Sequence, residues 1–222
     1  MKFKHCLALA AATLSLAAQA ASYDTNLIAN GGAESGASGW TAFDGYDLFQ
    51  SVSYGSNWVL PTQPGPVDRG AKMFTGVGAQ SAGFQIIDVS SLTATGAPVE
   101  YSLSGWLGGW QSQGDNALLY VSFLDITGSE IGHASIGPLS AADRGNQTGL
   151  FYRESLGLLP QGVSQVMFSL SMERLGGGDN DGYADNLSFV INTAPVPEPS
   201  SWALMAGGLL ALGGLARRRS QK

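Results

Sequence analysis

The segment VMFSLSME, residues 166–173, decides the fold class of this chain. Val166, Phe168, Leu170 and Met172 occupy every second position and alternate with Met167, Ser169, Ser171 and Glu173. Successive residues of an extended strand point to opposite sides, so a repeat of two places the first four side chains on one face. We therefore predict a strand here with one face in a core and the other toward solvent.

The same pattern recurs on both sides of this segment. Residues 101–107 and 187–191 also alternate, and residues 117–126 are apolar enough for a strand buried on both faces. Shorter candidate strands cover 48–53, 84–89 and 150–153. Clusters of Gly, Ser, Asn and Asp separate these segments as turns, and no long amphipathic helix is apparent. The chain is predicted to be all-β, an antiparallel β-sandwich of the jelly-roll kind.

The N-terminus has the three parts of a secretory signal peptide. Lys2 and Lys4 form a basic start, an apolar run extends to Ala18, and Ala18-Gln19-Ala20 fits the site that signal peptidase cleaves. We assign residues 1–20 to this signal. The only cysteine, Cys6, would leave with it, so the exported chain is expected to have no disulfide and no thiol chemistry.

Residues 21–194 are predicted to form one domain, and this domain is strongly acidic. It contains 16 of the 17 acidic residues but only 5 of the 11 Lys and Arg residues of the chain. Such a surface disfavours binding to nucleic acid and to anionic membranes, and favours solubility and divalent cations.

The C-terminal segment, residues 195–222, has three consecutive elements. Prolines at 195, 197 and 199 favour an extended, stiff linker. The uncharged run from 200 to 216 would form about 25 Å of helix, slightly short of the roughly 30 Å hydrocarbon core of a bilayer. A run of this length could also be a buried helix, but Arg217, Arg218 and Arg219 would hold its end in the cytoplasm. We therefore predict a single C-terminal transmembrane helix.

This order of Pro197-Glu198-Pro199, apolar run and arginine cluster resembles the PEP-CTERM sorting signal of exopolysaccharide-producing Gram-negative bacteria. The resemblance implies an exported precursor, anchored in the inner membrane and facing the periplasm. It also implies processing by an exosortase, a membrane sorting enzyme. The mature form would then lie at the cell surface or in the extracellular matrix.

Two segments of the predicted domain carry a second resemblance. NLIANGGAESG at 26–36, followed by Trp40, and DGYADNLSF at 181–189 resemble the first and last strands of galactose-binding-like domains, which include carbohydrate-binding modules. In such modules a Glu after the first strand and an acid in the last strand often hold a structural Ca²⁺. The resemblance therefore implies that Glu34 and Asp185 are calcium ligands.

The predicted burial of Asp185 is a second reason to expect a bound metal. Asp185 shares the parity of Leu187, Phe189 and Ile191, which would turn its carboxylate toward the core. A buried carboxylate is costly unless it is paired or bound to a metal. Asp181 and its neighbour Asp179 could add oxygen ligands, the kind that Ca²⁺ prefers. The alternative is that Asp185 begins a turn and that Glu34 is solvated.

A second candidate site follows the strand at 101–107. Sugar recognition needs a flat aromatic face together with amides and carboxylates for the hydroxyl groups. The loop after this strand supplies both, in Trp110, Gln111, Gln113, Asp115 and Asn116. Tyr54 and Trp58 could form a second platform. We expect Trp106 to pack in the core, whereas Trp110 either binds sugar or caps the edge of the sandwich.

Catalytic motifs are not found in this sequence. It has no G-x-S-x-G, H-E-x-x-H or P-loop pattern, and the exported part has one histidine, His133, expected on the solvated side of a strand. Arg144 is expected to sit in a turn and pair with Asp143 or another acid. We predict a non-catalytic surface or matrix protein that associates with extracellular polysaccharide. The alternatives are a structural biofilm-matrix protein without a ligand, and a small polysaccharide-acting enzyme that uses a pair of carboxylates.

Overall fold

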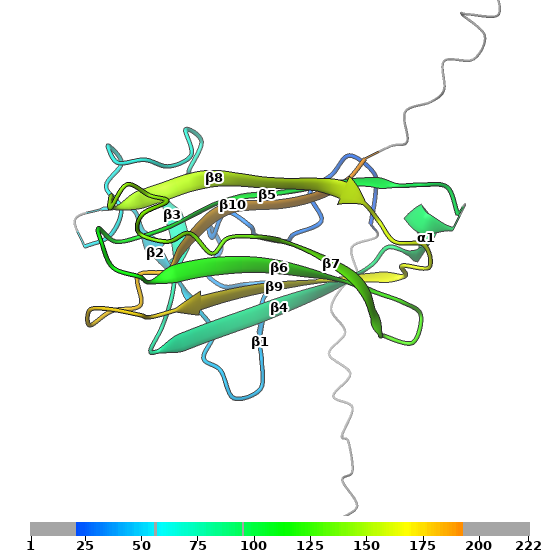
Figure 1. The fold of residues 1–222 in the computed structure, drawn as a ribbon, viewed down its shortest axis with the longest axis horizontal. Helices are drawn as coiled ribbons and strands as arrows, with labels where there is room; N and C mark the ends of the chain where they lie inside the picture. Colours follow the sequence, from blue (N-terminus) through cyan, green and yellow to red (C-terminus); the bar gives the residue numbers. More distant parts are fainter. Residues whose placement is uncertain (1–20, 56, 95, 193–222) are drawn as a thin grey trace, which may run out of the picture.

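The computed structural model describes residues 21–55, 57–94 and 96–192. Two five-stranded sheets lie face to face (Figure 1). Sheet I has the order β1 (Thr41–Ala42), β4 (Gln80–Asp88), β9 (Gln165–Glu173), β6 (Asn116–Leu124), β7 (Glu130–Ile136). Sheet II has the order β2 (Gln50–Ser53), β3 (Lys72–Thr75), β10 (Tyr183–Ile191), β5 (Glu100–Gly109), β8 (Gly149–Leu158). One short helix, α1 (Ser90–Thr93), follows β4.

The core lies between the central strands of the two sheets. Val166, Phe168, Leu170 and Met172 of β9 are at most 1% exposed, as the alternation predicts. They face the buried side chains of β10, and the rings of Phe168 and Phe189 have their centroids 5.2 Å apart. Every strand pair within the sheets is antiparallel. The predicted all-β antiparallel sandwich is therefore confirmed.

Strands β1 and β3 were not anticipated from the sequence, β7 was expected only as a strand around His133, and β8 was predicted too short. β1 has only two residues and β3 only four, too few for an alternation to be recognised. β7 combines Gly132, His133 and Ser135 with few apolar side chains, which hides it among turn residues. β8 extends well past the predicted 150–153 segment, to Leu158. Each of these strands is fixed by pairing with a neighbour rather than by its own pattern.

The predicted orientation of Asp185 toward the core is wrong. A register shift between Asp185 and Ser188 interrupts the pairing of β10 with β5. Asn186 adopts φ +46° within this bulge, and the extra residue reverses the parity of the strand. Asp185 is therefore opposite Trp106 and shares the outer face of sheet II with Tyr183, whereas Leu187 and Phe189 face the core.

The described chain begins and ends near the α1 end of the sandwich, which we call the tail pole. Figure 1 shows both ends of the described chain there. Asp24 N donates to Ile191 O, and Asn192 N donates to Glu100 O. β5 runs ten residues, roughly 33 Å, from there to the opposite end, which we call the loop pole. Loops 54–70, 110–115, 137–148 and 174–182 meet at that pole.

The predicted signal peptide at 1–20 and the predicted transmembrane helix in 195–222 lie outside the described residues. Within the part of the chain that the structure describes, no helix is long and apolar enough to cross a membrane.

Candidate functional site

The outer face of sheet II carries a second apolar cluster near the loop pole. Val59, from the segment 54–70 that connects β2 to β3, is fully buried there against Met73, Leu150 and Tyr183 of sheet II. Val52, Tyr54, Trp58, Trp106 and Trp110 pack against them and are partly buried. The loop-pole half of sheet II is thus covered on both faces, by the core on one side and by segment 54–70, which we call the cover, on the other. Aromatic side chains lie at the edge of this cover.

Trp106 and Tyr152 form an aromatic pair on this face, beside the second cluster. Their ring centroids are 5.8 Å apart at an interplanar angle of 62°, and they are register partners on β5 and β8. Tyr152 is 45% exposed, and its hydroxyl donates to Glu154 Oε1 over 3.3 Å. Ser102 Oγ donates to the same oxygen over 3.4 Å. We call Trp106, Tyr152 and Glu154 the β5–β8 site.

The expectation that Trp106 packs in the core is therefore wrong. Its parity on β5 is that of Ser102 and Ser104, opposite to the core residues Leu103 and Leu107. Sequence analysis also missed Tyr152 and Glu154 as site residues. Only the pairing of β5 with β8, which are about 45 positions apart in the chain, brings them beside Trp106.

The predicted sugar-binding loop is built mainly as a supported turn. Trp110 lies partly buried at the edge of the second cluster, and Gln111 is exposed with φ +42°. Asp115 is 0% exposed, and its two carboxylate oxygens accept the amides of Leu175, Gly176 and Asp181. Gln113 is partly buried, and Asn116 Nδ2 donates to the carbonyl of Gly114. Asp115 thus points into the protein, whereas Gln111 faces outward.

Arg144 holds this turn in place, which corrects the expectation of a surface ion pair. Its side chain is 2% exposed, and its guanidinium donates to the carbonyls of Gln111, Gln113 and Gln147 over 2.8–3.0 Å. Asp143 instead accepts from the hydroxyl and amide of Ser140. Burial lowers the pKa of Arg144, and the nearby Asp115 and Asp181 oppose that shift.

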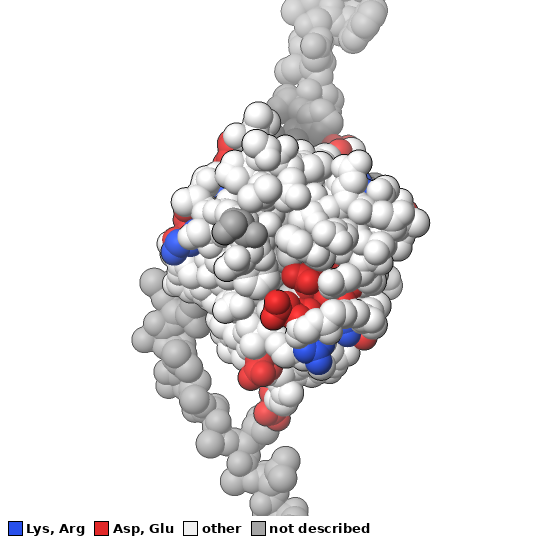
Figure 2. Space-filling view, turned by 90° about the vertical axis from the view of Figure 1, so that its left-hand side faces the viewer, with Lys and Arg blue, Asp and Glu red and all other residues white. Residues whose placement is uncertain are grey.

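Asp181 belongs to the same buried polar group. Tyr183 donates its hydroxyl to Asp181 Oδ1 over 2.7 Å, and burial raises the pKa of Asp181. The charges of Asp115 and Asp179 add to that rise. Figure 2 shows acidic side chains gathered at the loop pole, where the loops carrying these residues meet.

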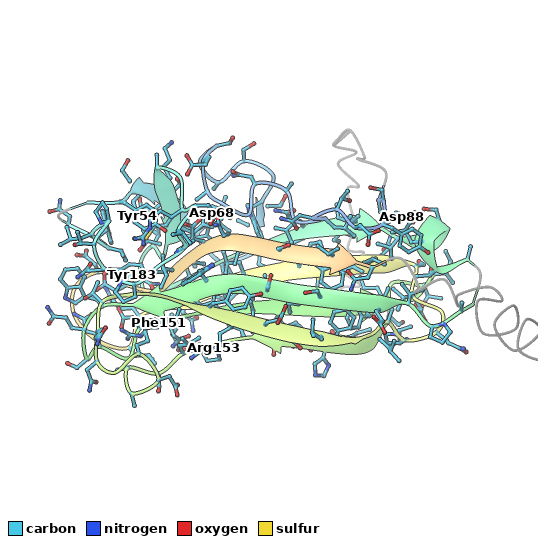
Figure 3. All side chains as sticks on the ribbon, turned by 90° about the horizontal axis from the view of Figure 1, so that it is seen from above. Tyr54, Asp68, Asp88, Phe151, Arg153 and Tyr183 are labelled. Atoms are coloured by element: carbon cyan, nitrogen blue, oxygen red, sulfur yellow. The ribbon has the colours of Figure 1, made fainter. Side chains whose placement is uncertain are left out.

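Asp185 lies beneath Tyr54 in a different group. It is 0% exposed, Tyr54 donates its hydroxyl to Oδ2 over 2.5 Å, and the Asn186 amide donates to Oδ1 over 2.8 Å. The pKa of Asp185 is raised to about 7, mainly because the carboxyl group is buried. The two hydrogen bonds and the charge of Arg69 oppose this rise, and the charge of Glu34 adds to it. Arg69 lies 5.1 Å above the ring of Tyr54. Figure 3 looks onto this face and shows Tyr54 and Asp68 at its loop-pole end.

The surroundings of Asp185 offer oxygen atoms of the kind that Ca²⁺ binds. Glu34 Oε1 accepts the amides of Ala71 and Lys72, and Asp68 Oδ1 accepts from the Asn186 side chain. A Cβ on Gly32 would lie 3.3 Å from Asn186 Oδ1 and 3.8 Å from Asp185 Oδ1, so the 30–33 turn approaches these oxygens closely. A cation would offset the cost of the buried Asp185 carboxylate, so the donor chemistry fits.

The described residues include no group of three or more His, Cys, Asp and Glu side chains arranged to hold a metal ion. A calcium ion here would therefore need amide, backbone or water oxygens besides Glu34 and Asp185. Asp181 instead interacts with Tyr183, Asp115 and Arg144. The calcium site stays a prediction.

His133 is exposed on β7, as expected from the sequence. Its ring stacks on Tyr120 with centroids 5.2 Å apart, and Tyr120 and Ser122 donate hydroxyls to Glu130. These residues lie on the outer face of sheet I, across the sandwich from the β5–β8 site. They provide a matched set of aromatic and carboxylate groups for comparison.

A family model described as a PEP-CTERM protein-sorting motif matches residues 195–220. The predicted sorting signal is thus confirmed as a motif of this tail. No curated protein sequence matches the chain at a significant level.

The sandwich is similar to carbohydrate-binding modules of known structure. A family 16 carbohydrate-binding module is 23% identical with a TM-score of 0.50, over 74% of this chain and 99% of that one. The xylan-binding CBM22-1 domain of Paenibacillus barcinonensis Xyn10C is 14% identical with a TM-score of 0.46, over 79% and 99%. The enzymatically active domain of bacteriophage CBA120 tailspike protein 4 is 16% identical with a TM-score of 0.50, but this chain spans only 21% of it. At these identities, the two matches with a TM-score of 0.50 show the fold alone.

Proposed function

We propose that this chain is an exported precursor whose β-sandwich binds extracellular polysaccharide without catalysing a reaction on it. The observation that carries the proposal is the half-exposed ring of Tyr152, set edge-on to Trp106 and bonded to Glu154. An aromatic ring offers its face to the apolar side of a sugar, and a carboxylate accepts from sugar hydroxyls. The similarity of the fold to carbohydrate-binding modules supports the same reading.

The sorting motif supplies the setting for this activity. Pro197, Glu198 and Pro199 would be recognised by an exosortase, and Arg217, Arg218 and Arg219 would hold the tail in the inner membrane until processing. The domain would then leave for the cell surface or the matrix, where polysaccharide is its partner. The described chain ends at Asn192 near the tail pole, at the end of the sandwich opposite to the loop pole.

Binding can be tested with the full-length chain in mild detergent, using affinity electrophoresis in gels that contain the polysaccharide of the producing cells. Tyr152→Ala should remove most of the retardation, because it removes the exposed ring. Tyr120→Ala is the matched control, since Tyr120 also donates its hydroxyl to a glutamate but lies on the outer face of sheet I. Equal retardation of wild type and Tyr152→Ala would refute this site, and no retardation of either would leave the ligand-free matrix protein as the better description.

We also propose that Glu34 and Asp185 hold a structural Ca²⁺ that ties the first turn of the domain to β10. Calcium added at neutral pH should raise the unfolding temperature of the wild type, and should have little effect on Asp185→Asn. Asp181→Asn is the comparison variant, because Asp181 lies in the group around Arg144. If calcium stabilises Asp185→Asn as much as the wild type, the ion binds elsewhere.

A further inference from the structure

The outward-facing side of β8 does not end at the β5–β8 site. Tyr152, Glu154, Leu156 and Leu158 share one parity on this edge strand, and Leu156 and Leu158 are 68% and 59% exposed. Their register partners on β5 are short or polar: Ser102 is opposite Leu156, and Glu100 is opposite Leu158. Both leucines therefore stand clear of their neighbours. Adjacent exposed leucines on an edge strand favour association with another surface, which makes this row a candidate contact surface.

A hollow of about 200 Å³ continues this row at the tail pole. Its lining is mostly apolar and includes Pro98, Val99, Leu158 and Pro160. Leu158 belongs to both features, so the apolar surface of Leu156 and Leu158 continues into the hollow, whereas Glu154 separates it from the ring of Tyr152. The row from residue 152 to residue 158 is about 20 Å long, at roughly 3.3 Å per residue.

The charges along this row restrict what can lie on it. Glu154 and Glu100 are its charged side chains, while Arg153 has the opposite parity on β8. A polyanion would meet like charge here, whereas a neutral polymer would not. Contact with leucine side chains does not stabilise bound sugar hydroxyls. Contact between leucine and methyl groups is favourable, because it removes apolar surface from water.

Building on the proposed function, we infer that the ligand is a neutral polysaccharide bearing apolar substituents, such as O-acetyl groups. Its chain lies along β8, with sugar rings on Tyr152 and Trp106. The substituents pack on Leu156 and Leu158, and the last of them enters the hollow. The leucine row thus selects the decoration of the polymer, and the aromatic pair binds its rings.

The test compares acetylated and deacetylated forms of a neutral β-glucan, a xylan and a mannan, with full-length protein in mild detergent. For at least one polymer, the acetylated form should bind about tenfold more tightly, as expected for burial of a few methyl groups. The double variant Leu156→Ser, Leu158→Ser should lose that preference and still bind the deacetylated form as the wild type does. Ile126→Ser with Ile131→Ser, two exposed isoleucines outside sheet II, is the matched control and should change nothing.

Each other outcome has a separate meaning. Equal binding of both forms by the wild type would overturn the substituent assignment and leave the proposed function standing. No binding to any polymer, in either form, would overturn both. Leucine-dependent binding to neutral phosphatidylcholine vesicles, or leucine-dependent dimerisation in sedimentation, would show that another surface occupies this row and would also overturn the assignment.

Discussion

The outer faces of the two sheets differ in what covers them. On sheet II, segment 54–70 covers a fully buried cluster that includes Tyr183 and Met73, and aromatic rings border it. On sheet I, Tyr120 and His133 stack at the surface, and no second apolar cluster covers them among the described residues. Sheet I has the one-sided burial of an ordinary antiparallel sheet. Sheet II has an added layer, and the accessible aromatic and leucine side chains lie where that layer ends.

Two tyrosines can test this difference directly. Tyr183 is 0% exposed beneath the cover of sheet II, whereas Tyr120 lies partly exposed on sheet I. Tyr183→Ala should lower the free energy of unfolding by about 3–5 kcal/mol, since it opens a cavity and removes the hydroxyl from Asp181. Tyr120→Ala should cost less than about 1 kcal/mol. Urea unfolding followed by circular dichroism would measure both, and similar losses would mean that the two faces are not different in kind.

The loop pole should be nearly as sensitive as the cover. Arg144→Met keeps the side-chain volume but leaves three carbonyls without their donor, and should cost about 3 kcal/mol. Arg153→Met is the control: Arg153 is partly exposed, donates to the carbonyl of its neighbour Tyr152, and should change stability by less than about 0.5 kcal/mol. If Arg144→Met did not change the free energy of unfolding, water would be able to replace the guanidinium as the donor to these carbonyls.

Asp185 should make the stability of the protein depend on pH. Its pKa is about 7 when folded, against an ordinary value of 3.8, so the folded state holds the proton more tightly than the unfolded chain. Its contribution is therefore present below about pH 4 and is lost as the pH rises toward 7. Over about two pH units inside this window the loss should be roughly 2–3 kcal/mol.

Asp185→Asn cannot lose a proton and should remove this slope. The difference between the two proteins isolates Asp185, because the other acids, including Asp181 with its raised pKa, are present in both. Both proteins should be measured in the presence of a chelator, because a bound cation would favour the ionised form of Asp185. Parallel curves for the two proteins across this range would show that Asp185 is ionised and paired when folded.

The sequence predicts the core of this molecule better than its outer face. Strands β9 and β5 are recognisable because one of their faces meets the core, so their apolar residues repeat every second position. The pairing of β5 with β8 is a contact between distant segments that no local pattern encodes. Tyr152 and Glu154 were missed for that reason, although the aromatic residues of segment 54–58 and Trp106 were noticed.

Asp185 and Arg144 show why burial of polar groups is hard to predict. The parity argument found that Asp185 is buried but put it on the wrong face, because the bulge at Asn186 adds one residue. Arg144 resembles a solvated turn residue in sequence, yet its partners are carbonyls of loops that fold over it. Backbone carbonyls have no residue-specific signature, so sequence alone cannot reveal such a partner set.

The smallest expected effect concerns one of the hydrogen bonds that join segment 54–70 to sheet II, the bond from Tyr54 to Asp185. Tyr54→Phe removes the hydroxyl that Asp185 accepts and should cost about 1 kcal/mol. That bond lowers the pKa of Asp185, so its loss should raise the pKa further and make the variant weakest relative to wild type above about pH 7. Tyr152→Phe is the control, because its hydroxyl meets an exposed carboxylate on the same sheet. A loss for Tyr54→Phe that is the same at every pH would mean that the hydroxyl does not favour the ionised form of the Asp185 carboxylate.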